Sequence, residues 1–121
     1  MVAELNGQLR DAFFPYDRSE VTPEALNALQ ADAALLLPIL PEFPALRIVV
    51  EGHCDERGSA EYNLGLGDRR AARAEAALTQ YGIPAQRIET ISYGKEMPQC
   101  TEPTESCWRR NRRAHVRLSQ P

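Results

Sequence analysis

The sequence lacks any apolar run approaching the roughly 18 residues that a membrane-spanning helix needs. It also lacks the charged, apolar and small-residue succession of a signal peptide at its start. Neither sign of charge dominates, because 14 Lys and Arg against 17 Asp and Glu give a net charge of −3, which argues against a general nucleic-acid binder. With two histidines, three cysteines and no CxxC or HxxxH pair, the sequence offers no complete ligand set for tetrahedral zinc.

The sequence otherwise has the composition of an ordinary globular protein. Of its 121 residues, 43% are hydrophobic and 26% are charged, and this length suits one domain with a real core. We predict that the domain spans residues 11–118, with short tails at residues 1–10 and 119–121.

The apolar patterns predict four strands and two main helices. Thr22 and Pro23 mark the start of a helix over residues 21–40, and Gly82 with Pro84 marks the end of a second helix over residues 60–81. Strands are expected at residues 11–16, 45–50, 87–93 and 113–118, with a short helical segment at residues 105–111. The order β-α-β-α-β-(α)-β predicts an α+β fold (an α/β sandwich), in which helices cover one face of a four-stranded mixed sheet.

Two of the cysteines, Cys100 and Cys107, flank the polar loop TEPTES. A bridge closing this loop would stabilise the fold by roughly 2–3 kcal/mol in the chain-entropy model, and it would require an oxidising compartment. The alternative is two unrelated thiols in a reducing cytosol, and spacing alone leaves both open. Cys54 is expected to be a small buried residue at a strand end.

The stretch EGHCDERGSAEYNLGLGDRRA joins a predicted strand to a predicted helix. Asp55 lies at the strand end, and Arg70 follows fifteen residues later on the helix. An Asp carboxylate accepts an ammonium group and the Arg fork matches a carboxylate, so the pair is typical of a pocket for a ligand carrying both charges. The alternative, which the residues alone favour, is a salt bridge tying helix to loop. Asn63 is expected to cap the helix or brace this loop.

The C-terminal region concentrates positive charge, since five of the 14 Lys and Arg fall between Arg109 and Arg117, beside Trp108. This run is the best indication of nucleic-acid binding in the chain. The acidic remainder favours the alternative, a helix-to-strand junction whose arginines are solvated or bind carboxylates. No nucleophile–base pair is recognisable, so we predict no enzymatic activity and no cofactor.

Four segments in order resemble the OmpA-like peptidoglycan-binding domain, most closely its peptidoglycan-associated lipoprotein (Pal) branch. They are FFPYDRSEVTPEA, VVEGHCDERGSAEYNLGLGDRRA, ISYGKEMP and NRRAHV. One such segment is a weak signal, whereas four at compatible spacings, covering nearly all of residues 11–118, are specific.

The resemblance implies a non-catalytic domain that binds the diaminopimelate residue in the peptide stem of peptidoglycan. Asp55 and Arg70 match the family's two diaminopimelate-binding residues, with the same interval between them. Tyr16 and Asp17 match the pair bordering that pocket, and Arg57 matches a ligand-facing arginine of the Pal branch. A pocket-wall position and two further motif positions complete the predicted site: Leu66, Asn63 and Arg112.

Two residues depart from the family's usual pattern. Cys54 stands where the family usually has Thr, which weakens or removes a hydrogen bond from that hydroxyl. Gly67 replaces the Ser of the wider family, as is common in the Pal branch. The pair Cys100–Cys107 lies outside the motif set, and the periplasmic location implied by the resemblance favours a disulfide there.

The resemblance further implies a protein on the periplasmic face of the Gram-negative outer membrane, held by an N-terminal lipid anchor absent from these 121 residues. Its implied partners are peptidoglycan and Tol-system periplasmic proteins, with no nucleic acid. We therefore predict that the protein anchors the outer membrane to the cell wall non-covalently. On this prediction, Asp55→Ala or Arg70→Ala abolishes binding to purified peptidoglycan and leaves thermal unfolding unchanged. The alternatives are a protein-interaction module of the envelope and, less favoured, a nucleic-acid binder.

Overall fold

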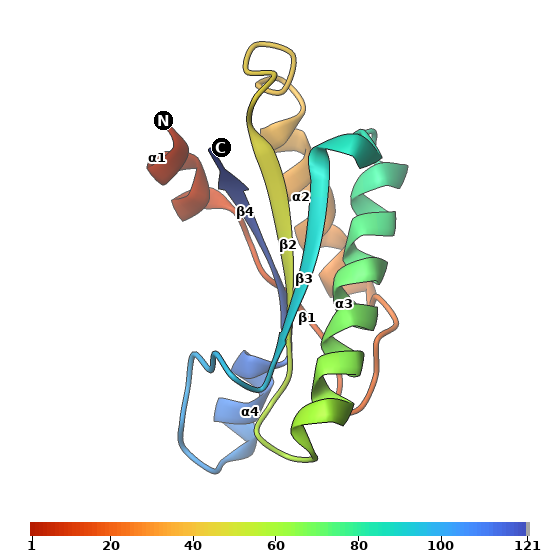
Figure 1. Ribbon diagram of the computed structural model, residues 1–121, viewed down its shortest axis with the longest axis vertical. Helices are drawn as coiled ribbons and strands as arrows, with labels where there is room; N and C mark the ends of the chain where they lie inside the picture. Colours follow the sequence, from red (N-terminus) through yellow and green to blue (C-terminus); the bar gives the residue numbers. More distant parts are fainter. Residues whose placement is uncertain (121) are drawn as a thin grey trace.

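The computed structural model describes residues 1–120 and contains five helical segments and four strands (Figure 1). In chain order these are α1 (Val2–Gln8), β1 (Ala12–Phe13), α2 (Pro23–Leu36), β2 (Arg47–His53), α3 (Ala60–Gln80), the 3₁₀ turn η1 (Ala85–Arg87), β3 (Ile88–Gly94), α4 (Glu105–Asn111) and β4 (Arg113–Ser119). Within this described part, no helix has the length and apolar character needed to cross a membrane.

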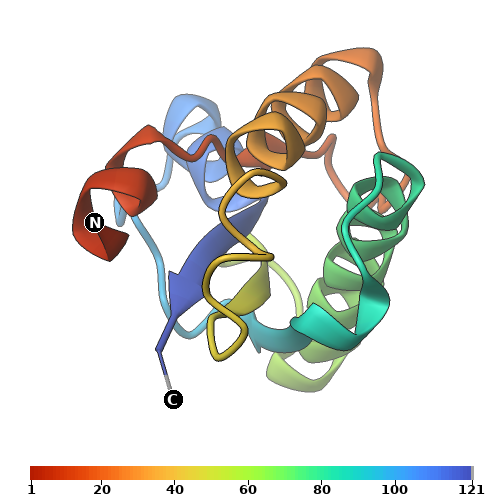
Figure 2. The ribbon, with the colours of Figure 1, turned by 90° about the horizontal axis from the view of Figure 1, so that it is seen from above.

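The four strands form one mixed sheet in the order β1-β4-β2-β3. β2 pairs in parallel with β3 and antiparallel with β4, and β1 pairs antiparallel with β4. Figure 2 shows α2 and α3 together on one face of this sheet, where their apolar residues and those of β2 and β4 form a single core. The predicted α+β fold, with two main helices on one face of a mixed sheet, is therefore confirmed.

The ends of the two main helices follow from local chemistry. The Thr22 hydroxyl accepts a hydrogen bond from the backbone N–H of Ala25 at 3.1 Å, and the Ser59 hydroxyl caps α3 by accepting one from Tyr62 at 3.1 Å. α2 ends at Leu36 rather than at the predicted residue 40, because Pro38 has no N–H to donate and restricts the residue before it.

Residues 1–10, predicted as a tail, contain α1, which lies beside β4. Leu5 and Leu9 pack against the core, and the side chain of Asn6 hydrogen-bonds both the N–H of Leu118 at 2.7 Å and its carbonyl at 3.2 Å. A seven-residue helix without a side-chain cap has little stability of its own. The tertiary contacts with β4 and the core therefore stabilise α1, and because they are not local, the sequence did not predict this helix. The predicted C-terminal tail, residues 119–121, begins inside β4, and residue 121 lies outside the described residues.

A close contact between two glycines fixes α3 against β2. A Cβ atom added to Gly52 would lie 1.8 Å from the carbonyl oxygen of Gly67, and one added to Gly67 would lie 2.9 Å from the carbonyl oxygen of Gly52. Only glycine at both positions allows this approach. Gly67, a departure from the wider family's pattern, thereby allows the first half of α3 to contact the end of β2 through the backbone.

The buried carboxyl group of Asp32 allows us to predict how the free energy of unfolding depends on pH. Asp32 of α2 is fully buried; its Oδ1 accepts a hydrogen bond from the N–H of Arg10 at 2.7 Å, whereas its Oδ2 has no partner. Burial raises the pKa of Asp32 from 3.8 to about 7. Between these values the native state holds a proton that the unfolded state has lost, so the free energy of unfolding should fall as pH rises, by at most about 4 kcal/mol.

Asp32→Asn removes this ionisation and should flatten the pH dependence between pH 4 and pH 7. Urea unfolding of both proteins at pH 5 and pH 8 measures the difference. His115, whose pKa its hydrogen bond with Asp11 raises, contributes in the same direction to both proteins, so the comparison isolates Asp32 together with its interaction with the charge on His115. Equal losses of stability in the two proteins would contradict the assignment to Asp32.

Candidate functional site

The predicted site residues converge at one end of the molecule, where β2 passes into α3 and where α4 lies (Figure 1). A small cavity of about 50 Å³ lies there. Its lining is Tyr16, Asp17, Cys54, Asp55, Arg57, Gly58, Tyr62, Asn63, Leu66 and Arg70. Seven of the eight residues predicted from the sequence are in this lining, and the eighth, Arg112, hydrogen-bonds Asp55.

A larger hollow of about 510 Å³ lies between β1, the start of α2 and α4. Of the predicted residues it contains only Arg112, and it lacks the buried carboxylate that would recognise an ammonium group. The smaller cavity is therefore the candidate site on chemical grounds, despite its volume.

Asp55 is the central anion of this cavity, only 3% exposed. Arg57 donates to it from its backbone N–H at 3.0 Å, from Nε at 3.2 Å and from Nη2 at 2.8 Å, and Arg112 donates from Nη1 at 3.4 Å. Burial alone would raise the pKa of Asp55, but these hydrogen bonds outweigh it and hold the pKa below its ordinary value of 3.8. Asp55 is thus a carboxylate at neutral pH.

Arg70 contacts backbone rather than Asp55. It is fully buried, and its guanidinium donates from Nε to the carbonyl of Arg18 at 2.9 Å, from Nη1 to that of His53 at 2.9 Å and from Nη2 to that of Pro15 at 3.1 Å. The interpretation of Asp55 and Arg70 as a mutual salt bridge is therefore wrong, since Asp55 pairs with Arg57 and Arg112. Burial lowers the pKa of Arg70, yet a guanidinium starts far enough above neutrality to remain charged.

The turn at residues 15–18 forms the wall opposite the strand end. Asp17 has a φ of 58°, in the left-handed region that Asp tolerates better than most residues, and the N–H of Arg18 bonds the carbonyl of Pro15 at 3.3 Å. The hydroxyl of Tyr62 on α3 donates to the Asp17 carboxylate. Arg70, by bonding two carbonyls of this turn, joins it to both α3 and β2.

Arg57 covers Asp55 and lies between two aromatic rings. Its Cζ is 4.0 Å from the ring centroid of Tyr16 and 4.0 Å from that of Trp108. Both contacts have the geometry of cation–π interactions. The small volume of the cavity follows from this closed arrangement, in which the guanidinium occupies the place beside Asp55 that a ligand's ammonium group would need.

The inner part of the cavity is braced by Asn63 and Cys54. Asn63 Nδ2 donates to the carbonyl of Arg57 at 2.8 Å, which is the loop-bracing role predicted for it. Burial raises the pKa of the Cys54 thiol, which donates to the carbonyl of Asn63 at 3.2 Å. A hydrogen bond thus survives where Cys54 replaces the family's Thr. Leu66, also buried, forms an apolar part of the lining.

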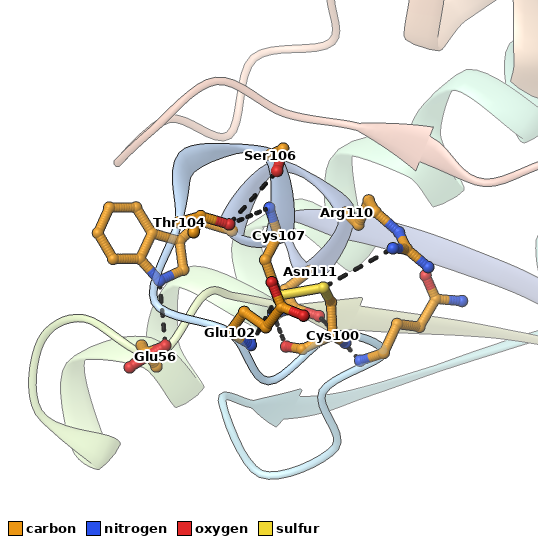
Figure 3. The surroundings of a disulfide bond; sticks show 10 residues. Glu56, Cys100, Glu102, Thr104, Ser106, Cys107, Arg110 and Asn111 are labelled. Carbon is orange, nitrogen blue, oxygen red and sulfur yellow. Dashed lines mark hydrogen bonds between the residues drawn. A yellow bond between two sulfur atoms is a disulfide. The ribbon is translucent and has the colours of Figure 1, made fainter.

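The predicted disulfide joins Cys100 to Cys107, whose Cα atoms are 5.3 Å apart, and secures the loop before α4 (Figure 3). Asn111 holds the same loop: its Oδ1 accepts from the N–H groups of Gln99 and Cys100 at 2.8 and 3.1 Å, and its Nδ2 donates to the carbonyl of Cys100 at 2.7 Å. The loop and α4 are therefore fastened together beside the cavity.

Three of the five C-terminal arginines bind carboxylates. Arg112 pairs with Glu105 as well as with Asp55, Arg113 lies 3.6 Å from Asp11, and Arg117 bonds Glu51 at 2.6 Å. These ion pairs agree with the predicted helix-to-strand junction, in which the arginines bind carboxylates, rather than with the basic surface expected of a nucleic-acid binder.

Three residues that lie beside Asp55 and its neighbours were not predicted from the sequence to belong to the site: Trp108, Glu105 and Tyr62. Glu105 and Trp108 are spaced i, i+3 and share one face of α4, and Arg112 directly follows the last residue of this helix. That spacing was visible in the sequence and would have indicated that α4 directs a whole face at the site. Tyr62 gave no comparable signal, because its contact with Asp17 joins residues 45 positions apart.

Known proteins are similar to this chain in sequence and in structure. The peptidoglycan-associated lipoproteins of Agrobacterium fabrum and Pseudomonas aeruginosa are 47% and 41% identical to this chain over 102 and 105 residues. These matches cover 84% and 87% of the chain, but only 55% and 60% of the relatives' own lengths.

Among solved structures, the peptidoglycan-associated lipoprotein from Burkholderia pseudomallei aligns with a TM-score of 0.81 at 33% identity, covering 94% of this chain and 93% of that one. The C-terminal domain of Helicobacter pylori MotB shares the fold, with a TM-score of 0.78 at 20% identity over 93% of this chain and 85% of that one. The sequence model of the OmpA family matches residues 13–112. The chain therefore belongs to the OmpA family.

Proposed function

We propose that this domain, residues 11–118, binds the diaminopimelate-containing peptide stem of peptidoglycan non-covalently and without catalysis. The observation that carries the proposal is the ionised, buried Asp55 at the centre of a cavity with Arg57, Arg70 and Arg112 around it. A single carboxylate among guanidinium groups suits a ligand group that carries an ammonium and a carboxylate together. The family membership and the names of the relatives support this ligand.

In the proposed complex, Asp55 accepts the ammonium group of diaminopimelate. Arg57, partly exposed and held only by Asp55 and two rings, moves aside from the carboxylate and remains close enough to bind the ligand. Arg112 stays with Asp55 and keeps the carboxylate in place through its second partner, Glu105, at 2.7 Å. The ligand's ammonium thus replaces the interaction that Arg57 makes in the free protein.

The ligand's carboxylate goes to Arg70 and to main-chain donors of the loop. A guanidinium has five N–H groups, and the three backbone carbonyls use one on each nitrogen of Arg70, so one remains on each of Nη1 and Nη2. Two N–H groups on neighbouring terminal nitrogens are the arrangement that binds a carboxylate bidentately. Arg70 would then serve the fold and the ligand at once.

The test is a calorimetric titration with a muramyl-type peptide containing diaminopimelate, beside the same peptide containing lysine. The lysine peptide keeps the ammonium and lacks the second carboxylate. Loss of a charge-assisted hydrogen bond of about 1.5–3 kcal/mol predicts roughly 10- to 150-fold weaker binding. Equal affinities would overturn the role given to Arg70, and binding of neither peptide would overturn the proposed function.

We further infer that the full-length protein anchors the outer membrane to the cell wall from the periplasmic side, through an N-terminal lipid. The disulfide Cys100–Cys107 supports an oxidising compartment. The names of the relatives, which describe lipoproteins associated with peptidoglycan, support the anchor.

A second candidate function is docking of a Tol-system periplasmic protein on the same end of the molecule. It is favoured by two aromatic residues at the rim of the cavity, Tyr16 and Tyr62, which are 57% and 48% exposed, because exposed tyrosines are enriched at protein interfaces. Competition between such a partner and the diaminopimelate peptide would show a shared surface, whereas simultaneous binding would separate the two.

A further inference from the structure

Arg57 covers Asp55 in the free protein only if its side chain is held in one place, and its own segment holds it poorly. It lies in the loop between β2 and α3, and its side chain is about one-third exposed. An exposed arginine has many rotamers, and fixing them costs conformational entropy. Two aromatic rings in contact with the guanidinium would limit that freedom, and the structure supplies them from residues 16 and 108.

The ring of Trp108 is itself firmly placed. Its indole Nε1–H donates to the carboxylate of Glu56 at 3.0 Å, the dashed line at Glu56 in Figure 3, so the residue next to Arg57 helps to orient the ring. Trp108 also directly follows Cys107, which the disulfide fixes, and α4 begins with the hydroxyl of Thr104 accepting from the N–H of Cys107 at 3.3 Å.

We propose that Trp108 is a positioning residue of the ligand site: its ring holds the guanidinium of Arg57 over Asp55, and α4 with its disulfide exists in part to hold that ring. This inference rests on the proposed function for the identity of the ligand. It extends the site to a residue that acts on the ligand through Arg57, and it gives the disulfide-closed loop a role in affinity as well as in stability.

A double-mutant cycle tests the coupling between the two residues. Trp108→Ala should strengthen binding of the diaminopimelate peptide about 3- to 10-fold, because the ligand's ammonium then displaces a guanidinium that has lost a cation–π contact of that size. In the Arg57→Ala background the same change should have almost no effect, because the side chain that it positions is gone. Trp108→Phe, which keeps a ring and loses the bond to Glu56, should bind with an affinity close to that of the wild type.

Phe43→Ala is the matched control, since Phe43 is an exposed aromatic residue in the connection between α2 and β2, at the opposite end of the molecule (Figure 1). Its affinity should equal that of the wild type. Independent, additive effects of Trp108→Ala and Arg57→Ala on the affinity, or weaker binding by Trp108→Ala, would overturn the proposal.

A second readout needs no ligand. Trp108 is the only tryptophan of the chain, so intrinsic fluorescence reports on this ring alone. Arg57→Ala should shift its emission to the red by exposing the indole to water, whereas Arg109→Ala, on another face of α4, should leave it unchanged. Unchanged emission in Arg57→Ala would overturn the positioning role even if the wild type bound no peptide, a result that by itself would count against the proposed function.

Discussion

Arg70→Ala is expected to lower the free energy of unfolding by about 3–5 kcal/mol, because each buried acceptor left without a donor costs about 1–3 kcal/mol. The side chain is fully buried and bonds the carbonyls of Pro15, Arg18 and His53, so its removal leaves three acceptors and a cavity. In a domain of this size the melting temperature should fall by roughly 10–20 °C. The expectation from the sequence, loss of binding with unchanged unfolding, is replaced by this one.

Two further variants make the result specific. Arg69→Ala, which removes the exposed neighbouring arginine of α3, should change the stability by less than about 0.5 kcal/mol. Arg70→Lys keeps the charge, but a single ammonium cannot reach three carbonyls in two segments as the guanidinium does, so most of the loss should remain. Thermal and urea unfolding measure all three. A melting temperature of Arg70→Ala equal to that of the wild type would show that the carbonyls find other donors.

Asp55→Asn is expected to weaken binding of the diaminopimelate peptide by roughly 30-fold to several thousandfold, the range for removing one member of a buried charge pair. Asparagine has nearly the same shape, so the change removes the charge that would meet the ammonium group and leaves Arg57 without its anion. Calorimetric titration measures the affinity. Asp68→Asn, an exposed acid on α3 outside the cavity, is the control and should bind as the wild type does.

The pH dependence of binding provides an independent check on Asp55. Because its pKa in the folded protein lies below 3.8, the carboxylate stays ionised, and binding should persist unchanged from pH 7 down to about pH 5. The part of the stability that its hydrogen bonds contribute is present above the unfolded pKa and is lost as pH falls through the lowered folded value. Binding that weakens already between pH 6 and pH 5 would identify another group as the ligand's anionic partner.

The closed position of Arg57 changes the interpretation of the motif. From spacing alone, Asp55 and Arg70 looked like a clamp or a salt bridge, whereas in the structure the free carboxylate is covered by Arg57 from two residues away. The ligand therefore competes with a side chain for Asp55, and affinity depends on how firmly that side chain is held. By holding Arg57 in this position, Trp108 would affect the affinity for the ligand.

Local patterns in the sequence determined much of this protein. Caps at Thr22 and Ser59, prolines, the glycine at residue 82 and the strand alternation fix where elements begin and end, because each acts through neighbours within a few residues. The spacing of Cys100 and Cys107 allowed the disulfide, and the family resemblance favoured it. The motif residues named the lining of the cavity almost completely.

Only the tertiary structure decided which atoms these residues meet. The partners of Arg70 lie 17, 52 and 55 residues away, and Trp108 meets a glutamate 52 residues away. Contacts of such length depend on the strand order and on the glycine contact between β2 and α3, which no local pattern encodes. The guanidinium group of a long, flexible arginine can bind a ligand, a carboxylate or a backbone carbonyl equally well, so the fold alone decides which of these it contacts.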